Sequence, residues 1–62
     1  MSKQEMIDQL QDRVAYNEEQ RAYYEGLYEK DQFECWKDMV EWFKGKIVAF
    51  NIAIEMAEEL SQ

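Results

Sequence analysis

The chain has 62 residues, 47% of them hydrophobic, and a formal net charge of −7 from 14 acidic and 7 basic side chains. This excess of acids argues against direct binding to nucleic acid or to anionic membranes, because both need clustered lysine and arginine. With Cys35 as the one cysteine and no histidine, an internal disulfide and a zinc site are both excluded, and we expect no metal or cofactor. A single domain this small then depends on self-association for stability.

The first predicted helix covers residues 3–28. Ser2 and Glu5 have the spacing of a capping box, in which the serine oxygen accepts from a backbone amide and the glutamate reaches back to the cap. A hydrophobic pattern with spacings of three and four residues follows, and this spacing is typical of a helix that pairs with another. The seam consists of Ile7, Leu10, Val14, Asn17, Arg21, Tyr24 and Tyr28.

Beside this seam the first helix carries a second stripe, which we call the tyrosine stripe and which consists of Tyr16, Tyr23 and Leu27. Tyrosine is favoured at protein interfaces because it offers a large apolar ring with a polar tip. These three residues are therefore candidates for binding a partner protein. The alternative is that they pack within the bundle, which uses the same physical interactions.

A second helix is predicted over residues 32–60, because Asp31 and Glu34 form a second capping box. The first helix must then end at Gly26, through a left-handed cap, or near residues 29–30. One uninterrupted helix is the competing interpretation, since the chain contains no proline. The seam of the second helix is Phe33, Trp36, Val40, Phe43, Ile47, Phe50, Ile54 and Ala57.

The two seams predict an antiparallel two-helix hairpin of the all-α class, formed by all residues 1–62 as one domain. Folding back at residues 30–31 sets five pairs face to face: Ile7 with Ile54, Leu10 with Phe50, Val14 with Ile47, Tyr24 with Trp36, and Tyr28 with Phe33. The polar positions Asn17 and Arg21 then lie opposite Phe43 and Val40. We interpret Asn17 as a register-setting residue and Arg21 as a side chain that extends to water, with a partner site as the alternative for both.

The second helix has more apolar surface than one neighbouring helix can cover, which predicts dimerisation of hairpins into a four-helix bundle. A ridge of small residues beginning at Gly45 would let another helix backbone approach closely. Alternatively, Gly45 ends the helix and makes three helices in all. The predicted dimer interface is Met39, Trp42, Gly45, Ala49, Ala53, Met56 and Leu60.

Catalysis needs a nucleophile, a base or a metal, and the chain lacks histidine and has serine only at positions 2 and 61. We therefore expect no enzyme activity and no small-molecule substrate, with Cys35 as an unreactive surface thiol. The sequence favours a small acidic interaction module, an adaptor, inhibitor or regulator of the kind found in phages and mobile elements, that binds another protein as a homodimer. The alternative is an acidic mimic of nucleic acid that blocks a DNA-binding protein. Because the chain has a free thiol and shows no export signal, we expect it in the cytoplasm. It also lacks an apolar run of about 20 residues, so we expect no membrane-spanning helix.

Overall fold

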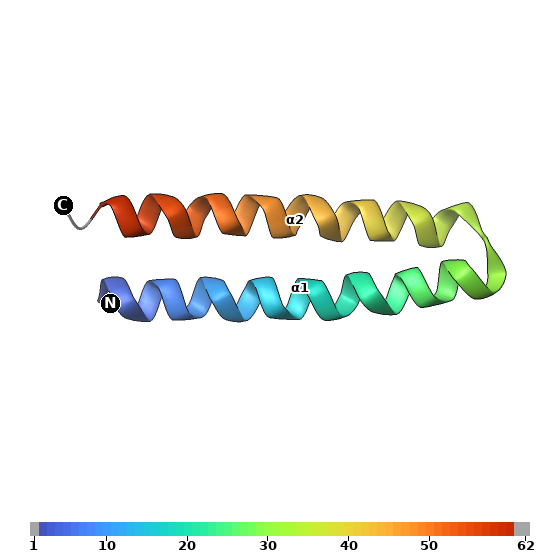
Figure 1. Cartoon of the computed structure of the whole chain (residues 1–62), viewed down its shortest axis with the longest axis horizontal. Helices are drawn as coiled ribbons and strands as arrows, with labels where there is room; N and C mark the ends of the chain where they lie inside the picture. The colour runs from blue at the N-terminus through green and yellow to red at the C-terminus, as the bar shows by residue number, and fades with distance from the viewer. Residues whose placement is uncertain (1, 61–62) are drawn as a thin grey trace.

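The computed structural model describes residues 2–60, which form two α-helices joined by a short link. Helix α1 spans Lys3–Asp31 and helix α2 spans Glu34–Glu59. The two helices run antiparallel side by side over their whole length, so the ends remote from the link lie together (Figure 1). The predicted all-α antiparallel hairpin is confirmed, and the alternative of one uninterrupted helix is wrong.

Helix α1 begins with the predicted capping box. The backbone N–H of Glu5 donates to Ser2 Oγ at 3.1 Å, and the backbone N–H of Ser2 donates to Glu5 Oε1 at 3.5 Å. Each bond satisfies an amide that has no partner within the helix itself. The first turn of α1 is therefore defined by its own sequence, without help from α2.

Helix α1 ends one residue beyond the predicted position near residues 29–30, and the alternative end at Gly26 is wrong. The helix continues through Gly26 to Asp31, and Gln32 adopts the left-handed conformation with φ 58° and ψ 29°. The backbone N–H of Gln32 donates to the carbonyl of Tyr28 at 2.7 Å, which caps the helix. A glutamine thus supplies the turn that glycine usually supplies, and Gly26 remains an ordinary helical residue.

The predicted capping box at Asp31 and Glu34 is wrong. Asp31 is the last residue of α1, and Phe33 occupies the N-cap of α2 in an extended conformation, with no hydrogen bond from its side chain. The left-handed turn at Gln32 explains this. An N-cap at Asp31 would require Gln32 to be the first residue of α2, but Gln32 is the C-cap of α1 instead. Helix α2 consequently starts two residues later than predicted, at Glu34.

Helix α2 passes through Gly45 without a break, so the three-helix alternative is also wrong. A Cβ atom built at Gly45 would meet nothing within 4 Å. Packing inside the hairpin therefore does not require glycine at this position. Glycine in a helix interior lowers helix stability by about 1 kcal/mol relative to alanine, and nothing within the hairpin explains its presence here.

The helices pack through two clusters, one at each end. Near the free ends Ile7, Ile54 and Ala57 are buried together, and the partly buried Met6, Leu10 and Val14 pack against them. Near the link the ring of Tyr24 lies 5.8 Å from that of Trp36 and 5.8 Å from that of Phe43, measured between centroids. The two clusters place the predicted pairs Ile7 with Ile54 and Tyr24 with Trp36 at the helix interface.

The register differs from prediction in the middle of the hairpin. The seam pattern places Phe43 opposite Asn17, but its ring stacks on Tyr24 instead, while Asn17 lies beside Lys46 and Phe50. The link at residues 32–33 explains the difference, because it lies two residues beyond the predicted turning point. Residues of α2 are accordingly displaced along α1 toward the link.

The core of this hairpin is thin. The buried hydrophobic residues of the described chain are Ile7, Val40, Phe43, Ile54 and Ala57, and within residues 2–60 no large side chain is completely buried. The accessible surface is 4776 Å², against roughly 4,200 Å² for a compact monomer of this mass. The hairpin thus exposes more surface than a closed fold of its size.

Candidate protein-interaction surface

The predicted dimer residues of α2 lie on its outer side, away from α1. Trp42 is 61% exposed, Met56 59% and Leu60 80%, and Gly45 and Ala49 are exposed as well. Met39 and Ala53 are half-buried at the margin of this surface. We call these seven residues the outer stripe; α1 leaves five of them exposed.

The tyrosine stripe of α1, made of Tyr16, Tyr23 and Leu27, also reaches the surface. Tyr16 is 57% and Tyr23 60% exposed, and Leu27 is half-buried. The ring of Tyr23 contacts the ring of Tyr24 edge to face, with 5.2 Å between centroids. Tyr24 in turn packs against α2, so Tyr23 is held in place at its edge while the rest of its ring faces water.

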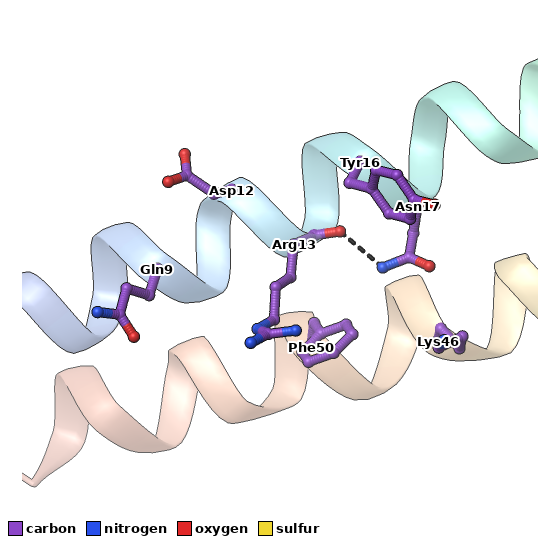
Figure 2. Close-up of a pocket in the computed structure, with 7 residues that line it drawn as sticks. All are labelled: Gln9, Asp12, Arg13, Tyr16, Asn17, Lys46 and Phe50. Atoms are coloured by element: carbon purple, nitrogen blue, oxygen red, sulfur yellow. Dashed lines mark hydrogen bonds between the residues drawn. The ribbon is translucent and has the colours of Figure 1, made fainter.

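A groove of about 380 Å³ lies between the two helices, and of the two stripes only Tyr16 lines it. From α1 it is lined by Gln9, Asp12, Arg13, Tyr16 and Asn17, and from α2 by Lys46 and Phe50 (Figure 2). The ammonium nitrogen of Lys46 lies 5.6 Å from the centroid of the Trp42 ring. Lys46 therefore connects the groove to Trp42 of the outer stripe. Helical spacing places Trp42 on the same side of the hairpin as Lys46, and Tyr23 on the same side as Tyr16. We call the tyrosine stripe and the outer stripe together the apolar face.

Arg21, the fourth predicted partner residue, lies elsewhere. Its guanidinium pairs with the carboxylate of Glu25 at 2.6 Å, one turn along α1. It lines a second groove together with Glu18, Lys44, Ile47 and Val48. Arg21 thus belongs to the side of the hairpin opposite Tyr16, which we call the charged face.

The charged face mixes both signs of charge. A groove of about 240 Å³ near the link is lined by Glu25, Tyr28, Glu29, Lys37, Val40, Glu41 and Lys44. The ammonium of Lys44 lies 3.8 Å from the carboxylate of Glu41. Lysines therefore lie among the glutamates at this groove.

The polar seam residue Asn17 is 3% exposed. Its Nδ2 donates to the carbonyl of Arg13 at 2.6 Å within α1, and its Oδ1 has no partner (Figure 2). An unpaired buried acceptor costs about 1–3 kcal/mol. Asn17 therefore makes no hydrogen bond across the helix interface, although a register-setting asparagine commonly does.

The predicted site residues do not include the cations on the apolar face. Arg13 and Lys46 line its groove, and within the described residues neither forms an ion pair. The signal that could have drawn attention to Lys46 is the spacing of acids in α2. None occurs between Glu41 and Glu55, although the chain has 14 in all.

Cys35 is a free, exposed thiol. Within residues 2–60 no three acidic or cysteine side chains gather into a possible metal site, and neither helix is long and apolar enough to cross a bilayer. The chain matches no protein-family model, and neither a curated protein nor a solved structure shows significant similarity to it. Residues 2–60 form an acidic helical hairpin whose exposed large apolar side chains include Tyr16, Tyr23, Trp42, Met56 and Leu60.

Proposed function

We propose that this chain is a small acidic protein-interaction module, an adaptor, inhibitor or regulator, that works as a homodimer and binds another protein. The observation that carries the proposal is the apolar face. Five large side chains on it are more than half exposed: Tyr16, Tyr23, Trp42, Met56 and Leu60. Large apolar side chains exposed along both helices in this way are typical of an interaction surface.

The energetics of covering this face support association. Side chains of this size contribute about 1.5–3 kcal/mol each when fully buried, so covering five that are more than half exposed contributes roughly 5–10 kcal/mol before association entropy. Tryptophan and tyrosine are also the residues that most often dominate binding energy at interfaces. The apolar face therefore has both the area and the residue types of a binding surface.

A pull-down experiment tests this function. The chain is immobilised, and the proteins that it captures from an extract of the native host are identified by mass spectrometry. The expected result is a specific partner whose capture persists from low to high salt, because apolar contacts are not screened. Capture should fall with Trp42→Ala and remain with Lys37→Ala on the charged face. A partner lost at moderate salt and insensitive to Trp42→Ala would indicate the acidic mimic instead.

A further inference from the structure

The tyrosine stripe and the outer stripe lie on one side of the hairpin, and this arrangement bears on how two copies meet. The sequence pattern assigns the outer stripe to the dimer and leaves the tyrosines to another partner. In the structure the same groove has Tyr16 on its α1 side and Lys46, beside Trp42, on its α2 side. A flat protein surface that packs on the outer stripe from this side also covers Tyr16 and Tyr23.

We propose that a second copy of this chain packs face to face on the apolar face, so that the tyrosines of α1 belong to the dimer interface together with the outer stripe of α2. This inference rests on the proposed function, in which the chain works as a homodimer. It gives the four-helix bundle a layered arrangement, with each hairpin as one layer.

The area of the face supports this arrangement. The Cα atoms of the hairpin span 48 × 14 × 12 Å, so its broad side has a flat area on the order of 700 Å² before side chains are added. A stable interface buries about 800 Å² on each partner. Both helices are needed to reach that value, because the outer side of α2 alone offers a much narrower strip.

Charge also favours contact along the middle of α2. Two chains of net charge −7 repel each other, and the repulsion is smallest where acids are sparse. Residues 42–54 of α2 contain no acid, and their charged residues are Lys44 and Lys46. Lys46 belongs to the apolar side, where its ammonium lies 5.6 Å from the Trp42 ring and 5.8 Å from the Phe43 ring.

The same face is complementary to itself in charge. Lys46 and Arg13 line the groove without an ion pair in the described residues, and Asp12 lies at the same groove. A symmetric dimer brings each groove against the other copy, which offers the carboxylate of one Asp12 to the cations of its partner. Lys46 therefore contributes to dimer affinity through charge as well as through its contact with Trp42.

Two pairs of matched variants test the proposal by sedimentation equilibrium, with far-UV circular dichroism as a check of folding. Tyr16→Ser and Val48→Ser alter side chains of nearly equal exposure, 57% and 58%, on the apolar and charged faces. Lys46→Glu and Lys44→Glu change the net charge equally, two residues apart, on the same two faces. We expect Tyr16→Ser and Lys46→Glu each to raise the dimer dissociation constant about tenfold, and the other two variants to leave it nearly unchanged.

The results that overturn the proposal also separate it from the proposed function. A dimer weakened by Val48→Ser and Lys44→Glu, or weakened equally by all four variants, would move the interface elsewhere and leave homodimerisation intact. A chain that sediments as a monomer would remove the homodimer as well. Capture of a partner protein by a monomer would still support an interaction module.

Discussion

The rings of Tyr24 and Phe43 stack across the helix interface, with 5.8 Å between centroids and an angle of 12° between planes. Tyr24 also contacts Trp36 at 5.8 Å, so one tyrosine of α1 lies against two aromatic residues of α2 that are two turns apart. Aromatic contacts of this kind contribute about 0.5–1.5 kcal/mol beyond the area they bury. This cluster fixes the register of the hairpin near the link.

Removing one ring of this cluster should unfold the hairpin. Phe43 is 8% exposed, and replacing a buried phenylalanine by alanine costs about 3–5 kcal/mol, which is a large part of the stability of a domain this small. We expect Phe43→Ala to lose most of its helical signal in circular dichroism at room temperature. Phe33→Ala, at a position 58% exposed, serves as the control and should melt close to the original chain.

A better cap at the start of α2 should stabilise the protein. Phe33 occupies the N-cap without a side-chain hydrogen bond, and serine or aspartate there would accept from an unpaired amide of the first turn. We expect Phe33→Ser to raise the free energy of unfolding by about 1 kcal/mol in urea titration. The complementary variant Ser2→Ala, which removes the cap of α1, should lower the free energy of unfolding by a similar amount. If Phe33→Ser instead destabilises the protein, the ring of Phe33 is covered in solution.

Gly45→Ala should separate folding from association. A Cβ atom at Gly45 has open space within the hairpin, so alanine should stabilise α2 by about 0.5–1 kcal/mol in the dissociated chain. If another backbone approaches Gly45 in the dimer, the added methyl group should at the same time weaken dimerisation. Thermal melts at low chain concentration measure the first effect and sedimentation the second; unchanged dimer affinity would place Gly45 outside the interface.

The unpaired oxygen of Asn17 predicts that an apolar residue is better tolerated at this position. Asn17 is 3% exposed and its Oδ1 has no partner, so Asn17→Leu removes an uncompensated buried acceptor. We expect about 1–2 kcal/mol of added stability in urea titration at one fixed chain concentration, since dimerisation makes stability depend on concentration. A loss of stability of that size would mean that Asn17 Oδ1 is hydrogen-bonded in the assembled protein.

Much of the fold follows from local sequence signals. The spacing of apolar residues predicts both helices, and the capping box at Ser2 and Glu5 is confirmed because its bonds form between residues one turn apart. The link could not be predicted as well. Asp31 and Glu34 have the same spacing as Ser2 and Glu5, but Asp31 ends α1 and Phe33 is the N-cap of α2. The left-handed turn between the helices lies at Gln32, and no glycine marks it in the sequence.

The surface was predicted residue by residue but not as an arrangement. Helical spacing identifies the outer stripe and the tyrosine stripe separately, because each lies on one helix. Whether they share a side depends on how each helix is rotated about its own axis at the interface. That rotation follows from tertiary packing, here of Tyr24 between Trp36 and Phe43, and it also turns Arg21 away from Tyr16.

Sedimentation equilibrium of the unaltered chain tests most directly whether the apolar face pairs with a second copy. At micromolar concentration we predict a species of twice the chain mass of 7.5 kDa, shifting toward monomer on dilution. A single species of 7.5 kDa over the whole micromolar range would contradict the homodimer and leave Trp42, Tyr16 and Tyr23 exposed without a partner copy.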